Sequence, residues 1–441
     1  MMYKKNIYNN IMDNIIKYVK GLKYYDELYD LPWKLKLNKK ITKKHYNNVN
    51  VALINVPCGG FGDVIACKTL YDYFTDWYPT LNTYICTPDI DNFKTLQVDT
   101  ENMIKLKRLD NTDCPPLSKL KLTKKKKFDI IIVVPVVKRE FFIEEIKPLI
   151  PYATYFNTFT MSEYNGIFEK YTFPIGIGKS QLGLLLNNVK FKKHNLIKSP
   201  YALIYIQPPD LNFPHANHCF LEFIRMISNK YNFTSFQVVV PDWIVDIIRC
   251  YLNDPQPGTC YKINKKLKEY TKNYPNVIMI DEHGKKYIIK NCLKCNKTMI
   301  IRGDILPKPR NEFISLIKYS VDDVLLTGDQ SITDAFSCCV NKIIWYQIAP
   351  WKKKFSTEMS KYIPDKYFKT FKTSCGTIKG IHYHPKYIKF LDKFDFRKNG
   401  KPIIDAILLF NYNKSDYKDY IQIVESSRKI SSVINKLNKI N

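Results

Sequence analysis

Glycine is scarce in this chain: only 15 of its 441 residues are glycine. The chain also lacks any apolar run that approaches the roughly 18 residues of a membrane-spanning helix. Residues 1–22 contain neither the long apolar core nor the small-residue cleavage site of a signal peptide. The 12 cysteines are scattered with no secretory context, so we expect free thiols in a reducing compartment. These absences predict a cytoplasmic protein, or one of a viral factory or virion if the source is a virus.

Acidic residues are also in the minority: the chain has 41 Asp and Glu residues but 69 Lys and Arg residues, which gives a formal net charge of +28. A basic surface attracts phosphate, so nucleic acid is one partner that this charge suggests. The lysines are spread along the chain, however, and the one dense run is at 119–128. Lys, Asn, Ile and Tyr dominate, and their codons are AT-rich, which indicates an AT-biased genome such as that of a protist or a large DNA virus. We therefore expect codon bias, rather than nucleic-acid binding, to explain most of the charge.

From about residue 50 the chain alternates apolar strand-like runs with helix-like segments. Continuous apolar strands separated by helices are typical of parallel sheets covered on both faces. The expected fold is α/β, with two tandem Rossmann-like domains, parallel sheets and a helical C-terminal tail. The expected domains are a helical leader at 1–48, an acceptor domain at 49–190, a donor domain at 191–350 and a helical extension at 351–441.

The stretch VPCGGFGDVIACKTLYDYF, residues 56–74, holds three of the few glycines, Gly59, Gly60 and Gly62, followed by Asp63. It passes from an apolar strand into a helix, where backbone N–H groups and the helix dipole favour anions. The spacing matches neither GxGxxG nor GxxxxGK[ST]. A structural corner is the alternative, and Asp63 then serves as an N-terminal cap rather than as a base.

The stretch LLTGDQSITDAFSCC, residues 325–339, repeats this design with Gly328 and Asp329 at the turn. Ser331 and Thr333 follow at the helix start, with Asp334 behind them. Such a turn suits a diphosphate or a sugar. Taken alone, it is more typical of an ordinary capped helix, because Ser and Thr followed by an acid are common at helix starts.

Together, the GG-x-GD turn and the late Gly-Asp turn resemble those of the GT-B glycosyltransferases, particularly the heptosyltransferase-like branch. The resemblance implies a GT-B fold that moves a sugar from a nucleotide-sugar to an acceptor hydroxyl in an interdomain cleft. It also implies a reaction without a metal or other cofactor, and direct displacement with a single base would invert the configuration at the anomeric carbon. Asp63 matches the family's general base, and the acceptor would lie over Gly59, Gly60, Phe61 and Gly62. Gly328, Asp329, Gln330 and Ser331 match the turn that binds the donor.

Two positions depart from that family. Asp334 stands where the family usually has His, and the loop after the first strand of the second domain has His215 instead of Lys. A departing diphosphate needs positive groups, for which His215, Arg302 and Lys352 are the candidates. Each has a plainer interpretation: His215 as a loop residue, Arg302 as an ion pair with Asp304, and Lys352 as solvated charge.

The CxxC of Cys292 and Cys295 has no second pair at a zinc-site distance, so we expect free thiols there rather than structural zinc. Two other classes of function remain open. One is a basic nucleic-acid-binding protein, and the other is an assembly protein on a GT-B scaffold that has lost catalysis.

Overall fold

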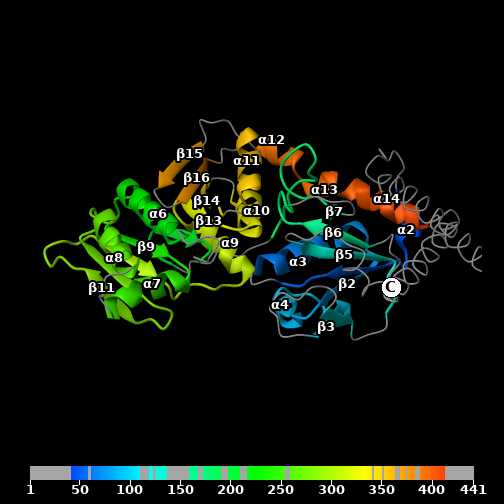
Figure 1. The fold of residues 1–441 in the computed structure, drawn as a ribbon, viewed down its shortest axis with the longest axis horizontal. Helices are drawn as coiled ribbons and strands as arrows, with labels where there is room; N and C mark the ends of the chain where they lie inside the picture. Colours follow the sequence, from blue (N-terminus) through cyan, green and yellow to red (C-terminus); the bar gives the residue numbers. More distant parts are fainter. Residues whose placement is uncertain are drawn as a thin grey trace, which may run out of the picture.

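The structure is a computed structural model. It describes residues 41–57, 61–109, 119–122, 126–136, 158–166, 172–189, 197–208, 216–253, 259–339, 342–349, 352–362, 368–373, 376–382 and 388–412. Most of the predicted leader, together with Gly59, Gly60 and His215, lies outside these residues. Two lobes lie side by side, each built around one sheet (Figure 1).

The first sheet has seven strands in the order β4-β3-β2-β1-β5-β6-β7. All neighbours pair in parallel except β3 and β4. Its strands are β1 (Asn50–Ile54), β2 (Asn82–Thr87), β3 (Met103–Arg108), β4 (Leu120–Leu122), β5 (Ile130–Val136), β6 (Thr158–Ser162) and β7 (Thr172–Phe173). The strand order reverses direction between β1 and β5, which makes this pair the topological switch point of the sheet.

The second sheet has nine strands in the order β11-β10-β12-β9-β8-β13-β14-β16-β15. The six strands from β10 to β14 in this order are parallel. At one edge β11 pairs antiparallel with β10, and at the other β16 pairs antiparallel with both β14 and the edge strand β15. The strands are β8 (Tyr201–Tyr205), β9 (Ser235–Val239), β10 (Asn276–Ile280), β11 (Lys286–Lys290), β12 (Thr298–Arg302), β13 (Asp323–Leu326), β14 (Ile343–Gln347), β15 (Phe368–Thr373) and β16 (Gly376–His382). Its switch point is between β8 and β13.

The helices and short turns complete the α/β arrangement, and none of the described helices is long and apolar enough to cross a membrane. They are α2 (Lys43–Tyr46), α3 (Phe61–Trp77), α4 (Ile90–Thr95), η1 (Thr100–Asn102), α6 (Ala216–Lys230), α7 (Asp242–Asn253), α8 (Thr259–Tyr270), α9 (Arg310–Tyr319), α10 (Asp329–Cys338), α11 (Lys353–Tyr362), α12 (Ile388–Lys393), α13 (Phe396–Asn399) and α14 (Lys401–Tyr412). The expected two-sheet α/β fold with a helical C-terminal part is confirmed. That part also contains the hairpin β15–β16, which the sequence did not predict. Lys and Thr residues interrupt every apolar run in it, so no strand pattern is visible there.

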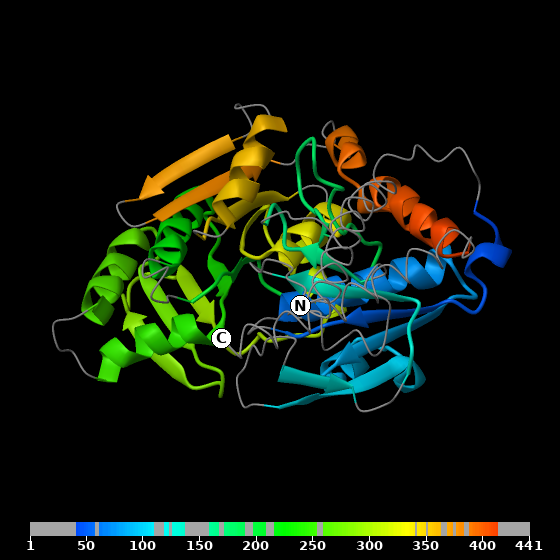
Figure 2. The ribbon, with the colours of Figure 1, turned by 45° about the vertical axis from the view of Figure 1, so that its right-hand side comes forward.

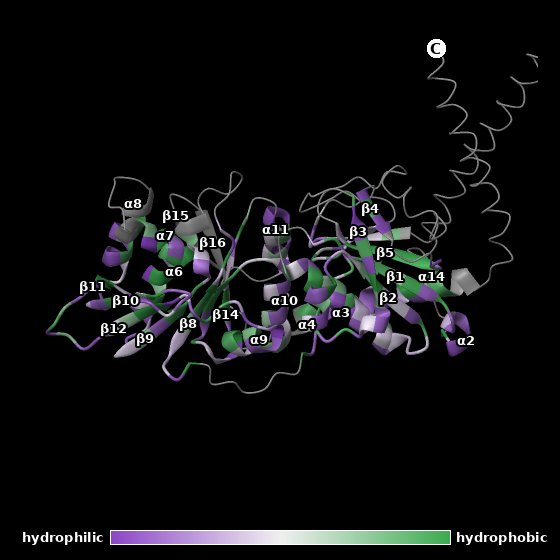
Figure 3. Ribbon diagram, turned by 90° about the horizontal axis from the view of Figure 1, so that it is seen from below, coloured by the Kyte–Doolittle hydropathy of each residue, from purple (hydrophilic) through white to green (hydrophobic). Residues whose placement is uncertain are grey.

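One hydrophobic core joins the two lobes. It contains Val64 and Leu70 of α3 from the first lobe, with Ile332 and Phe336 of α10 and Phe355 of α11 from the second. One face of β1 and β5, strands coloured as hydrophobic in Figure 3, also belongs to it through Val51, Leu53, Ile130, Ile132 and Val134. Because the apolar faces of α3, α10 and α11 are buried in the same cluster, these helices fix the lobes against each other.

The C-terminal helices return to the first lobe (Figure 2). The N–H of Leu184 donates to Phe394 O at 2.7 Å, and the N–H of Phe396 donates to Leu184 O at 3.1 Å. Gly183 has a φ of +103°, and a Cβ there would lie 2.5 Å from the carbonyl carbon of Phe394. Only glycine therefore allows this close approach of the two backbones.

Candidate functional site

The first candidate turn lies at the carboxyl end of β1, beside the switch point of its sheet. Phe61, Gly62 and Asp63 form the first turn of α3, and Asp63 is half-buried. The buried Asn55 side chain donates from Nδ2 to Asp63 O at 3.1 Å and to Val134 O at 2.8 Å. Asn55 therefore holds the start of α3 against β5, which fixes the position of the Asp63 backbone.

The second candidate turn joins β13 to α10 at the other switch point. Gly328 has a φ of 78°, and a Cβ built on it would meet only Ser331 Oγ, at 3.9 Å. The Ser331 hydroxyl donates back to Thr327 O and, at 3.3 Å, to Gly328 O. Thr333 Oγ1 likewise donates to Asp329 O at 2.6 Å. Both hydroxyls donate to backbone carbonyls of this stretch, and no side chain of the described residues caps the start of α10, so the side-chain cap of the plainer interpretation is not formed.

Lys352 joins the second turn to the first lobe. Its Nζ lies 2.7 Å from Asp329 Oδ2 and 2.8 Å from Glu163 Oε2, and the Tyr164 N–H also donates to Asp329 Oδ2 at 3.0 Å. Burial acts to lower the pKa of Lys352, but the two carboxylates act more strongly and raise it above its usual value. The Lys352 side chain is only 8% exposed, so the interpretation as solvated charge is wrong.

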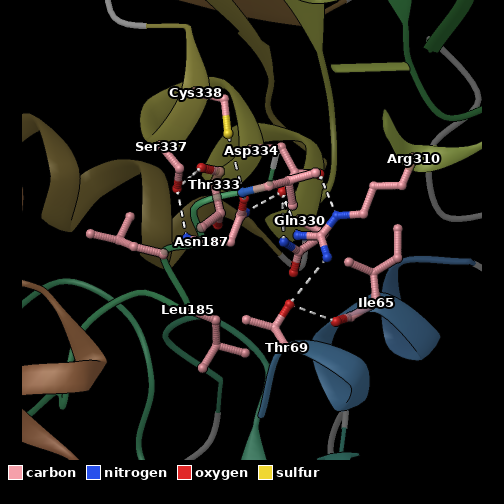
Figure 4. Close-up of polar contacts among 12 residues, drawn as sticks. Ile65, Thr69, Leu185, Asn187, Arg310, Gln330, Thr333, Asp334, Ser337 and Cys338 are labelled. Atoms are coloured by element: carbon pink, nitrogen blue, oxygen red, sulfur yellow. Dashed lines mark hydrogen bonds and ion pairs between the residues drawn. The ribbon is translucent and has the colours of Figure 1, made fainter. Parts of the chain in front are cut away.

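A second polar cluster surrounds Asp334 (Figure 4). Arg310 Nη2 lies 2.7 Å from Asp334 Oδ1, and Arg310 Nη1 lies 3.5 Å from Thr69 Oγ1 on α3. The Oδ1 atom of Asp334 also accepts from Gln330 Nε2 at 3.0 Å and from Asn187 Nδ2 at 2.5 Å. Asp334 and Gln330 thus help to hold the lobes together, which the sequence motifs do not indicate.

Arg310 itself is not among the residues that the sequence singles out. It is the first residue of α9, where a positive side chain is unfavourable because the helix dipole is also positive there. That local conflict is the one signal in the sequence that Arg310 has a partner elsewhere. Burial acts to lower its pKa, but Asp334 outweighs burial and raises it.

Arg302 forms an ion pair with Asp304, as the plainer interpretation of this residue predicts. Its Nε and Nη2 each lie 2.6 Å from an oxygen of Asp304, and Nη1 donates to Gln237 Oε1 at 2.7 Å. The strand β12, which Arg302 ends, is three positions from β13 in the sheet. At the usual strand spacing this is about 14 Å, so the structure does not bring Arg302 and Gly328 together.

The described residues contain no group of three or more His, Cys, Asp and Glu side chains that could hold a metal ion. Cys292 and Cys295 lie beside each other without further ligands of this kind in the described part of the chain.

No family model matches the chain, and no curated protein matches it by sequence. Among solved structures, it is similar to a glycosyl transferase family 9 protein from Veillonella parvula, with 8% identity and a TM-score of 0.35 over 68% of this chain and 80% of that one. It is also similar to a UDP-forming α,α-trehalose-phosphate synthase from Burkholderia xenovorans, with 10% identity and a TM-score of 0.25 over 84% of this chain and 78% of that one. Neither likeness is close enough to bear on the activity of this chain.

Proposed function

We propose that the protein is a glycosyltransferase that moves a sugar from a nucleotide-sugar to an acceptor hydroxyl. The observation that carries the proposal is the position of the two Gly-Asp turns. One follows β1 at the β1/β5 switch point, and the other follows β13 at the β8/β13 switch point. Ligands of open α/β sheets bind outside the carboxyl ends of the strands at such points.

In this proposal Asp63 removes the proton from the acceptor hydroxyl as the oxygen attacks the anomeric carbon of the donor. The nucleoside diphosphate leaves from the opposite face, so the configuration at that carbon is inverted. A carboxylate is a suitable general base when its position is fixed. The bonds from Asn55 to Asp63 O and Val134 O supply such a fixed backbone.

The donor diphosphate would lie at the start of α10. Its contacts there would come from the backbone N–H groups that follow Gly328 and from the positive end of the helix dipole. The side chains of Gln330, Ser331 and Asp334 are already bonded within the protein. Lys352 adds positive charge beside this turn but is held by two carboxylates.

Those internal bonds also favour a second candidate function, a GT-B scaffold that has lost catalysis and serves in assembly. Here the residues at the donor position would act only to join the lobes. The two candidates differ in whether the protein binds a nucleotide-sugar and turns it over.

A thermal-shift panel of nucleoside diphosphates and nucleotide-sugars separates them. A donor present at 100 times its Kd stabilises the folded state by about 2.7 kcal/mol, so one nucleotide class should raise Tm clearly. Release of the nucleoside diphosphate in the presence of acceptor glycans, lipids or peptides then tests transfer. If no member of the panel raises Tm at millimolar concentration, the glycosyltransferase proposal fails and the scaffold function stands.

A further inference from the structure

The loop between β11 and β12 holds two cysteine thiols against each other. Cys292 Sγ lies 3.2 Å from Cys295 Sγ, and the N–H of Cys295 donates to Cys292 O at 3.1 Å in a tight turn. Cys295 is exposed and Cys292 is half-buried. Leu293, between them, is 96% exposed, so both thiols lie at the protein surface.

One side chain fastens both ends of this loop. Asn276, the first residue of β10, accepts from the N–H of Cys292 through Oδ1 at 2.7 Å and donates from Nδ2 to Cys295 O at 2.7 Å. These two bonds hold the four-residue turn in the shape that brings the sulfur atoms together. Asn276 therefore fixes the positions of the two thiols relative to each other at this edge of the sheet.

The two thiols are not equivalent. A hydrogen bond from Cys295 and one from the backbone N–H of Lys294 lower the pKa of Cys292, and Lys290 also favours its thiolate. The pKa of Cys295 is raised, because it supplies that hydrogen bond. A thiolate is the nucleophile in disulfide exchange, so Cys292 is suited to attack first and Cys295 to react second.

We propose that Cys292 and Cys295 form a redox-active dithiol that is oxidised by low-molecular-weight disulfides of the glutathione class. The Cys292 thiolate attacks one sulfur of the disulfide, forms a mixed disulfide and releases one thiolate. Cys295 then loses its proton to solvent and attacks Cys292 Sγ, which forms the intramolecular disulfide and releases the second thiolate. The protein pair is oxidised by two electrons, and the small disulfide is reduced to two thiols.

The test uses the full chain, equilibrated in buffers of reduced and oxidised glutathione and analysed by intact and peptide mass spectrometry after alkylation. We expect a Cys292–Cys295 disulfide, seen as the loss of two hydrogens from the peptide that contains both residues. Cys295→Ser should trap glutathione on Cys292. Cys250, another exposed thiol, is the internal control and should give only a mixed disulfide.

Asn276→Ala tests the geometry. Loss of two hydrogen bonds that hold the loop should lower the yield of the intramolecular disulfide by about tenfold at a fixed glutathione ratio, while Cys250 reacts as before. Mixed disulfides alone on Cys292 and Cys295, or a Cys292 that reacts no faster than Cys250, would overturn the proposal. Because the readout is a mass change and not transfer activity, its outcome is independent of the proposed glycosyltransferase function.

Discussion

Arg310 and Asp334 form a buried ion pair at the junction of the two lobes. Their nitrogen and oxygen atoms are 2.7 Å apart, and the side chains are 8% and 2% exposed. The same guanidinium reaches Thr69 on α3 of the first lobe. A charge pair in this position is strongly destabilising when one partner alone is removed, because the other charge remains buried.

Arg310→Met should therefore lower the free energy of unfolding by about 3–5 kcal/mol, since Asp334 loses its compensating charge. Urea denaturation measures this loss. Lys361→Met is the matched control, because Lys361 pairs with Glu358 but is 60% exposed, and its loss should cost at most about 1 kcal/mol.

The double variant Arg310→Met with Asp334→Asn should be more stable than the sum of the two single losses predicts. Strict additivity, or an Arg310→Met loss no larger than that of Lys361→Met, would show that Arg310 and Asp334 do not compensate each other's buried charge.

Lys352→Met should lower the free energy of unfolding by about 3–5 kcal/mol, because Glu163 and Asp329 would face each other without a cation between them. Lys353→Met is the control one residue away, since Lys353 is exposed, and its effect should stay within about 0.5 kcal/mol. Equal Tm values for the two variants would show that Lys352 does not join the lobes.

Asp63→Asn should leave the fold and the donor-induced rise in Tm unchanged and reduce kcat by about 100- to 10,000-fold, the usual contribution of a general base. Initial rates of nucleoside diphosphate release, with a donor found in the thermal-shift panel, measure this. Asp91→Asn removes a carboxylate that pairs with Lys94 on the surface of the same lobe and should retain full activity. An active Asp63→Asn enzyme would exclude Asp63 as the base, even if glycosyl transfer itself were established.

Lys342 makes stability depend on pH. Its Nζ donates to Ser320 O and, at 3.0 Å, to Val321 O, and burial lowers its pKa from 10.5 to about 8. Between these values the unfolded chain holds a proton that the folded chain has released. The free energy of unfolding therefore rises with pH in this window, by about 3 kcal/mol in total at 1.36 kcal/mol per pKa unit.

Lys342→Met lacks this titration. The difference in unfolding free energy between wild type and Lys342→Met should thus shift in favour of the wild type as pH increases from about 7.5 to about 10. Other groups that titrate in this range cancel in the comparison. A difference that stays constant across the window would mean that Lys342 keeps its proton in the folded protein.

The sequence by itself determined most of the secondary structure, because continuous apolar runs such as those of β1, β5 and β13 must be buried on both faces of a sheet. It also placed both Gly-Asp turns between a strand and a helix, since glycine there marks where the backbone changes direction. It did not reveal β11 or the hairpin β15–β16, whose Lys and Thr residues interrupt the apolar pattern.

Only the tertiary structure decided which charges meet. The local sequence predicts only that Asp334 lies in a helix and that Lys352 is a surface lysine. In the structure Asp334 pairs with Arg310, and Lys352 pairs with Glu163, which is distant in the sequence. The sequence also could not show that both turns lie at switch points, because strand order depends on pairing between distant segments. Local patterns determine which apolar residues are buried, whereas the burial of a charge such as Lys352 and its partner depend on how the two lobes pack.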